Sequence, residues 1–153
     1  MAAAANWQEL QAEVGSELGV SEWFLIDQDR VDSFADVTLD HQFVHVDPDR
    51  ARATQFGGTI AHGLLTLSLI VHLCLAFVPK LKNTKLLVNY GFDKVRFSAP
   101  VKVGSRIRAR GKLADIAERR PGQVIVRLNV TIEIENEDKP ALVAEWLSLH
   151  VVG

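Results

Sequence analysis

Asp40 and His45 stand five residues apart within residues 37–48 of this chain. A carboxylate and an imidazole this close in sequence can hold one water molecule and move its proton. The cluster Ala61-His62-Gly63 follows and opens a long apolar run. If that run is a helix, the amides at its N-terminus favour negative charge on a ligand. The two segments together indicate a site that activates water next to a group that stabilises an anion.

From the spacing alone, a structural interpretation of the pair stands beside the catalytic one. Asp40 could accept hydrogen bonds from loop amides, and His45 could be a packed histidine whose ring nitrogens are satisfied. The other histidines offer less: we expect His41 to be exposed or close behind the site, His72 to be partly buried on a helix, and His150 to lie in a strand. The choice between the two interpretations therefore depends on the residues around the pair.

The composition is typical of one globular domain. The 153 residues contain no repeat or linker, and 48% hydrophobic against 24% charged residues is enough to bury a core. A net charge of -2 argues against a protein that binds nucleic acid through its phosphates. The single cysteine, Cys74, excludes an intramolecular disulfide and metal sites built from several cysteines. Its apolar neighbours favour a small buried side chain over a nucleophile.

The chain offers no signal for export or for membrane insertion. The N-terminal residues lack the basic start and long apolar core of a signal peptide, so we expect the cytoplasm. Residues 60–78 are largely apolar but include two histidines and are at the short end of spanning length. A helix that is apolar on every side also suits the core of a protein. We therefore expect residues 60–78 to form a buried helix and the protein to have no membrane contact.

The first half of the chain predicts helices and one short strand. Residues 7–18 have helical spacing of apolar residues, although Gly15 and Gly19 leave the end of that helix open. Capping and breaking residues mark the other elements. We expect a strand over residues 22–26, a helix over 29–35 with Asp29 as a cap, a short helix from Asp47-Pro48 through Ala53, a break at residues 56–58, and the long helix from Thr59 to near Pro79.

The second half predicts an antiparallel sheet. Residues 124–134 alternate between apolar and polar side chains, which is typical of a strand with one buried face. Residues 106–113 alternate in the same way, and residues 119–122 form the turn between these two strands. Residues 86–97 and 142–152 supply two more. Since a buried helix must be covered, we predict an α+β fold in which a curved antiparallel sheet wraps a long central helix.

This order of elements resembles the hotdog fold, and the motifs resemble those of the MaoC-like, (R)-specific enoyl-CoA hydratases, in particular the nodulation-protein-N-like branch. The likeness covers roughly residues 24–152 of a single domain, with residues 1–20 as an N-terminal helical extension. The matching positions are Phe34, Thr38, Asp40, Val44, His45, Val46, Asp47, Ala51, His62-Gly63 and Ser68. The sequence departs from the family signature where Leu39 replaces a glycine and Gln42-Phe43 replaces Asn-Pro.

The resemblance implies hydration of a trans-2-enoyl thioester to an (R)-3-hydroxyacyl thioester. Asp40 would act as the base toward water, and His45 would deliver the proton to C2. The Gly63 amide would bind the thioester oxygen, and His62 would shape that turn. Ser68 would hydrogen-bond near the catalytic loop, its alternative being a bond to a helix carbonyl, and Gln42 would supply an amide. No metal or cofactor is implied beyond the coenzyme A or acyl-carrier-protein thioester, and a homodimer is expected.

Two other functions stay open. A hotdog thioesterase would use the carboxylate to activate water against the thioester carbonyl. A non-catalytic acyl-thioester-binding subunit is favoured by Leu39 and Gln42-Phe43. The arginine stripe Arg106, Arg108 and Arg110 could attract coenzyme A phosphates, as could Lys94 and Arg96, but we favour a solvated strand face paired with Glu133 or Glu135.

Overall fold

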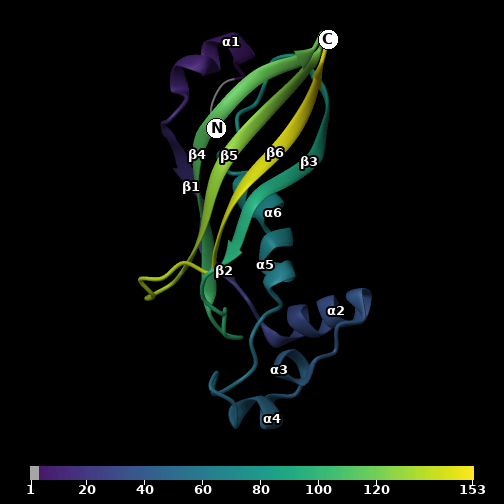
Figure 1. Ribbon diagram of the computed structural model, residues 1–153, viewed down its shortest axis with the longest axis vertical. Helices are drawn as coiled ribbons and strands as arrows, with labels where there is room; N and C mark the ends of the chain where they lie inside the picture. The colour runs from purple at the N-terminus through teal and green to yellow at the C-terminus, as the bar shows by residue number, and fades with distance from the viewer. Residues whose placement is uncertain (1–3) are drawn as a thin grey trace.

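One antiparallel sheet accounts for most of the second half of the chain (Figure 1). The computed structural model describes residues 4–153. The sheet has six strands in the order β1-β4-β5-β6-β3, with β2 also paired to β4. The strands are β1 (Glu17–Val20), β2 (Phe24–Leu25), β3 (Thr84–Phe97), β4 (Arg106–Arg120), β5 (Gln123–Ile134) and β6 (Leu142–Val152). The predicted curved antiparallel sheet is confirmed.

The period-two pattern of β5 explains how the sheet acquires its apolar face. Its even-numbered residues from Val124 to Ile134 are all buried. A tight turn at Pro121-Gly122 joins β4 to β5, since Arg120 already pairs with Gln123. Gly122 has a φ of +75°, which a residue with a side chain adopts only at a cost.

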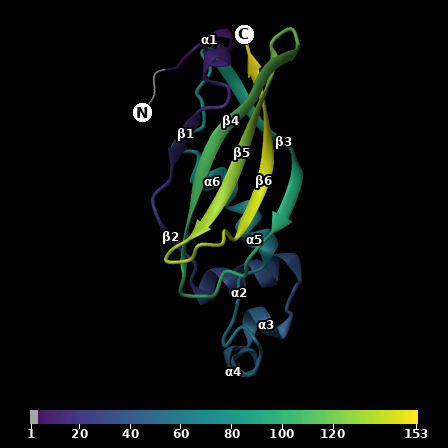
Figure 2. The same ribbon diagram turned by 60° about the vertical axis from the view of Figure 1, so that its left-hand side comes forward.

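The central helix lies against the concave face of this sheet (Figures 1 and 2). It consists of α5 (Gly63–Ser68) and α6 (Ile70–Cys74), and the bonds from the Leu69 amide to Leu65 and from the Leu73 amide to Leu69 run across the junction. The helix is shorter than predicted. Residues 59–61 are held in extended form because Ile60 bridges to Lys102 and the Ala61 amide donates to the Val101 carbonyl at 2.8 Å.

The expectation that this helix is buried on every side is wrong for the single chain. Its inner face is buried, and Cys74 on that face has the pKa of its thiol raised to about 12 by burial. The opposite face is open, with Leu64 60% and Leu75 58% exposed. His72 is also exposed and packs against Phe24, instead of being partly buried. The open apolar face indicates that something covers it in the functional protein.

Three short helices form a lobe beyond one end of the sheet (Figure 1). They are α2 (Gln28–Thr38), α3 (Phe43–Val46) and α4 (Pro48–Arg52). The predicted cap of α4 is confirmed, since the Asp47 carboxylate accepts from the Arg50 amide at 3.0 Å. The predicted cap of α2 is wrong: Asp27 accepts from the Arg30 amide, so the helix starts earlier than expected.

The N-terminal segment is less helical than predicted. It contains α1 (Trp7–Leu10) and the 3₁₀ turn η1 (Gln11–Glu13). The turn ends at Glu13, Gly15 then adopts a φ of +91°, and Leu18 belongs to β1. Residues 1–3 of the expected extension lie outside the described residues. Within residues 4–153, no helix is long and apolar enough to cross a membrane.

Candidate active site

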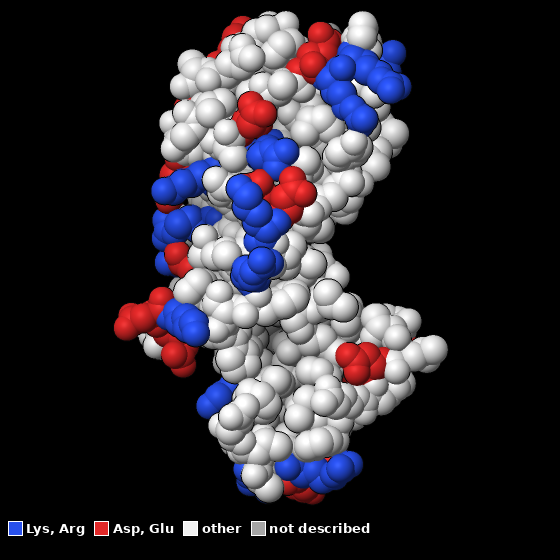
Figure 3. All heavy atoms as spheres, viewed as in Figure 1, with Lys and Arg blue, Asp and Glu red and all other residues white. Residues whose placement is uncertain are grey.

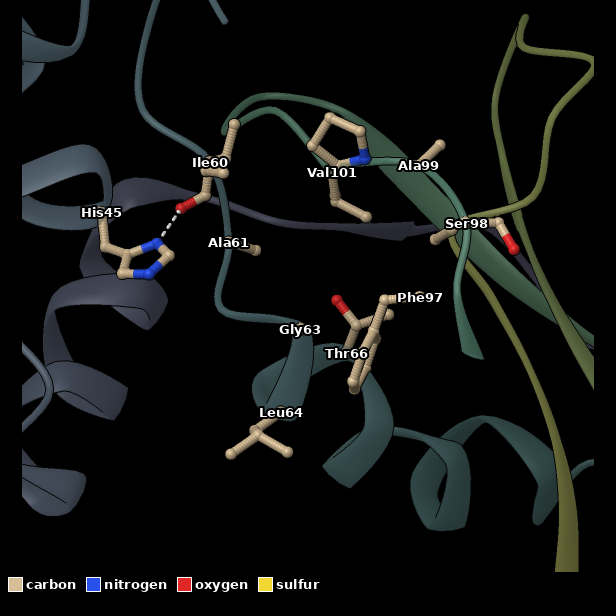
Figure 4. Close-up of a pocket in the computed structure, with 12 residues that line it drawn as sticks. His45, Ile60, Ala61, Gly63, Leu64, Thr66, Phe97, Ser98, Ala99 and Val101 are labelled. Carbon is tan, nitrogen blue, oxygen red and sulfur yellow. Dashed lines mark hydrogen bonds between the residues drawn. The ribbon is translucent and has the colours of Figure 1, made fainter. Parts of the chain in front are cut away.

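A cavity of about 390 Å³ opens where the N-terminus of α5 meets the lobe (Figure 4). In the space-filling view, the surface is hollowed between the sheet and the lobe (Figure 3). The lining is mostly apolar and comes from four separate parts of the chain. It consists of His45, Ile60, Ala61, Gly63, Leu64, Thr66, Phe97, Ser98, Ala99, Pro100, Val101 and Ala141.

His45 is held in one orientation at the wall of this cavity. Its side chain is 8% exposed, and Nδ1 lies 2.7 Å from the carbonyl oxygen of Ile60 (Figure 4). A carbonyl only accepts, so Nδ1 carries the proton and Nε2 keeps its lone pair in the neutral ring. The backbone of His45 is fixed as well, because Gln28 Nε2 donates to its carbonyl at 2.7 Å. Thr59 in turn donates to Gln28 Oε1 at 2.6 Å.

Asp40 is exposed and follows directly on the C-terminal end of α2. Leu39 before it adopts a left-handed conformation, with φ 62° and ψ 20°. The Asp40 carboxylate is only loosely held, through a contact of 3.4 Å from the Gln42 amide. The ligand atoms of Asp40, His45 and His62 all lie within 4.8 Å of one another. The proximity of carboxylate and imidazole expected from the sequence is therefore present.

His62 lies between the two predicted catalytic residues. Its Nε2 is 2.9 Å from the backbone oxygen of Asp40, and its ring stacks on that of His45 with 3.8 Å between centroids and 25° between planes. Phe34 packs against the same ring at 4.9 Å. Only 3% of His62 is exposed, and its Nδ1 has no hydrogen-bond partner among the described residues.

Asp40, His45 and His62 also have the residue types of a metal site. Two imidazoles that bind one ion must direct their in-plane lone pairs toward a common point. The stacked rings of His45 and His62 instead have nearly parallel planes, so one ring would have to turn before both could bind the same ion. The geometry thus suits proton handling better than metal binding, and the expected lack of a metal stays a prediction.

Gly63 begins α5 and lines the cavity. The first amides of a helix have no partner within the helix, so the Gly63 N–H can face a ligand. A Cβ atom at this position would come within 2.9 Å of the Phe97 ring. Glycine is therefore needed here for the close approach of Phe97, a reason that the sequence did not reveal.

Two of the other predicted site residues take little part in the cavity. Ser68 is exposed and its hydroxyl donates to the Leu64 carbonyl at 2.7 Å, which is the alternative considered for it. The Gln42 side chain is exposed. Gln42 contacts the pair through its backbone, whose amide faces the Asp40 carboxylate and whose carbonyl accepts from the His45 amide. Thr66 is 2% exposed and lines the cavity in their place, although it was not predicted from the sequence as a site residue. Its position three residues after Gly63, on the inner side of a helix, was the available signal.

Two members of the arginine stripe, Arg108 and Arg110, are paired with Glu133, as the preferred interpretation expected. Arg108 Nε and Arg110 Nε lie 2.6 and 2.7 Å from the two oxygens of Glu133. Burial raises the pKa of Glu133, but the hydrogen bonds from Arg110 and Arg108 outweigh it and lower that pKa below its ordinary value. Lys94, one of the two other residues considered for binding coenzyme A phosphates, forms an ion pair with Glu145 at 2.8 Å.

Comparison with known proteins shows which family and which proteins this chain is similar to. Residues 9–135 match the family model described as MaoC like domain. The chain is 51% identical over 137 residues to nodulation protein N of Rhizobium meliloti, covering 89% of this chain and 85% of that protein. It is 46% identical over 143 residues to 3-hydroxyacyl-thioester dehydratase Z of Mycobacterium tuberculosis, covering 94% of each. Among solved structures, R-hydratase PhaJ1 of Pseudomonas aeruginosa is similar with a TM-score of 0.72 and 25% identity, over 97% of this chain and 86% of that one.

Proposed function

This chain belongs to the MaoC-like domain family, and we propose on that premise that it is a hydro-lyase that adds water to trans-2-enoyl thioesters. The product would be the (R)-3-hydroxyacyl thioester, and the reverse reaction would be its dehydration. The observation that carries the proposal is the position of Asp40 and His45 within 4.8 Å of each other at an apolar cavity. The hydratase and dehydratase names of the relatives support this class of reaction.

The hydrogen bond between His45 and Ile60 supports a role for His45 in proton transfer. In hydration, water forms the bond to C3, one proton leaves that water, and one proton is added at C2. In our proposal, the reaction starts with Asp40 ionised and His45 protonated on both ring nitrogens. Asp40 accepts the proton from water while His45 donates its Nε2 proton to C2. The Nδ1 proton stays hydrogen-bonded to the Ile60 carbonyl oxygen whether or not Nε2 is protonated, so the ring need not rotate. Transfer of the proton from Asp40 to His45 then restores the starting state.

The α5 N-terminus supplies the proposed site for developing charge. As C3 is attacked, negative charge builds on the thioester oxygen, and the Gly63 amide would donate to that oxygen. A preorganised donor of this kind is worth about 3–4 kcal/mol of barrier. The apolar side chains of Ile60, Leu64 and Val101 would contact the acyl chain. The carrier would leave the cavity past Phe97, and we favour coenzyme A over an acyl carrier protein.

The exposed edge of the sheet supports a homodimer. β3 pairs on one side only, with β6, and carries large exposed side chains. These are Leu86, Leu87, Val88, Tyr90 and Phe97. The open side of the central helix adds Leu64 and Leu75. Charged side chains gather over β4 and β5, while the side of the molecule formed by β3 has wide uncharged areas (Figure 3). A second copy that pairs along β3 would cover this edge and the adjoining helix face.

The proposed activity is tested with the purified protein and crotonyl-CoA. We expect loss of the conjugated enoyl-thioester absorbance and formation of 3-hydroxybutyryl-CoA with (R) configuration, established by chromatography on a chiral phase. Release of free thiol instead of loss of the enoyl group would identify a thioesterase. If neither reaction occurs with short or medium acyl chains but the thioester binds saturably, the protein would be identified as a binding subunit.

A further inference from the structure

We propose that His62 is a positioning residue that holds Asp40 and His45 together and remains neutral throughout the reaction. This inference rests on the proposed function, because it concerns the same pair. It goes beyond the shaping of the turn at Gly63, which the resemblance suggested for His62. The contacts of its ring are with Asp40 and His45, and the described residues that line the cavity include His45 and Gly63 but not His62.

The first of these contacts fixes the backbone at Asp40. Since the carbonyl of Asp40 only accepts, His62 Nε2 must carry the proton of that 2.9 Å hydrogen bond. Asp40 needs such a restraint, because its carboxylate is exposed and follows the left-handed Leu39. The bond spans 22 residues and joins the end of α2 to the start of α5. His62 thus sets where the carboxylate stands relative to the central helix.

The second contact fixes the ring of His45. The two imidazoles stack at 3.8 Å, and the tilted Phe34 ring packs on His62 at 4.9 Å. The Ile60 carbonyl restrains His45 in the plane of its ring, and the stack restrains it perpendicular to that plane. Both restraints together fix the direction of the Nε2 lone pair. A displacement of about 1 Å at such a group costs about 100-fold in rate.

The third observation is the unpartnered Nδ1 of His62. With the proton on Nε2, Nδ1 has only a lone pair, and that atom is buried without a partner among the described residues. Protonation there would create a buried donor with no acceptor, and it would place a positive charge against the ring of His45. Both costs keep His62 neutral while His45 exchanges its proton. His62 is therefore not a second acid or base.

Two substitutions separate the two contacts. His62→Gln keeps an amide donor of similar reach but removes the ring, and His62→Phe keeps an aromatic face but removes the donor. We expect each to lower kcat about 10- to 100-fold through misplacement of one member of the pair. KM should change by no more than about threefold, since the cavity lining is intact. The exposed His72, substituted as His72→Gln, is the matched control and should leave both constants unchanged.

The pH dependence of kcat separates a positioning role for His62 from a role as an acid or base. Both limbs of the wild-type profile should persist in His62→Gln and His62→Phe, because Asp40 and His45 still perform the transfers. Loss of one limb in both variants would make His62 an acid or base and overturn the proposal. A kcat within about twofold of the wild type in both folded variants would also overturn it.

Nuclear magnetic resonance tests the geometry without turnover. The ¹⁵N shifts of the His62 ring in the wild-type protein should identify the neutral form with its proton on Nε2, across the pH range of activity. A proton on Nδ1 would overturn the proposal even if a variant failed to fold. An inactive wild-type protein would instead overturn the proposed function, and the ¹⁵N measurement would still decide on the His62 contacts.

Discussion

The Nδ1 atom of His45 lies 2.7 Å from the carbonyl oxygen of Ile60, and this contact determines which ring nitrogen is free for chemistry. Ile60 comes from the extended segment before α5, so His45 is oriented by the same backbone that leads to Gly63. The orientation of the proposed base partner and the position of the proposed oxygen-binding amide are therefore coupled through three residues of main chain.

This coupling leads to a prediction for His45 and Asp40. We expect Asp40→Asn and His45→Gln each to lower kcat/KM by about 10²–10⁴-fold, since each removes one proton-transfer group. The double variant should be little worse than either single one, because the two act as a unit. Initial rates with crotonyl-CoA measure the effect, and circular dichroism confirms folding.

A matched variant separates chemistry from orientation at His45. His45→Asn places an amide donor where Nδ1 stands, so it can keep the bond to Ile60 while it lacks any group at Nε2. We expect this variant to be as stable as the wild type and as inactive as His45→Gln. Wild-type turnover in Asp40→Asn, His45→Gln or His45→Asn would disprove the assignment of the pair.

The sequence predicts the pair but not its supports. The five-residue spacing and the surrounding motif were enough to predict that Asp40 and His45 lie close together. The Ile60 carbonyl, the Gln28–Thr59 bond and the His62 stack depend on contacts between segments far apart in the chain, and such contacts leave no local pattern. Ser68 matched the motif by position, yet its hydroxyl bonds to its own helix.

The elements of the fold were likewise predicted where a local pattern determines them and missed where contacts between distant segments do. β5 was predicted within one residue, because a buried face imposes period two, whereas β4 continues seven residues beyond its predicted end at Leu113. The helix over residues 59–79 was predicted too long, since the sequence could not show that Ile60 pairs with Lys102. β1 was missed because its few residues become a strand only through pairing with β4.

Leu39 provides a prediction on stability. A residue with a Cβ pays about 1–2 kcal/mol for a left-handed conformation, and Leu39 has a φ of 62° with 82% of its surface exposed. Glycine avoids that strain but costs about 0.5–1 kcal/mol of backbone entropy. We expect Leu39→Gly to be at least as stable as the wild type, measured by the midpoint of urea unfolding.

Leu39→Ala is the control for this effect, because it removes the exposed side chain but keeps the Cβ atom. It should be less stable than Leu39→Gly by roughly 1 kcal/mol. A Leu39→Gly protein that unfolds at lower urea concentration than Leu39→Ala would show that the strain of the left-handed backbone is smaller than the entropy cost of glycine.

The β3 edge provides a prediction on assembly. We expect the wild type to be a dimer and the double variant Leu86→Lys/Val88→Lys to be a monomer, because two charges on adjacent positions of one strand face oppose pairing along that edge. Light scattering after size-exclusion chromatography measures the mass. Val143→Lys, on the interior strand β6 and 37% exposed, is the matched control and should stay dimeric. A wild type that is monomeric at micromolar concentration would exclude this dimer.

His150 and Glu133 should weaken the fold at acid pH in two separate windows. Burial lowers the pKa of His150 below its ordinary value of 6.5, and the ring bonds to the Ser148 hydroxyl at 3.1 Å. A base whose folded pKa is depressed contributes stability above its unfolded pKa and loses it as the pH falls toward the folded value. The His150 contribution should therefore fall below pH 6.5. Glu133, whose pKa lies below its ordinary 4.5 because of Arg110 and Arg108, should lose its contribution only below pH 4.5.

Urea midpoints measured at a series of pH values separate the two groups. His150→Phe removes the titrating ring and should flatten the decline that begins at pH 6.5, while leaving the lower window unchanged. Glu133→Gln should do the reverse, since it removes the carboxylate that Arg108 and Arg110 hold. If the His150→Phe protein kept the full wild-type decline between pH 6.5 and 4.5, another group would have to account for it, and burial of His150 would carry no linkage to folding.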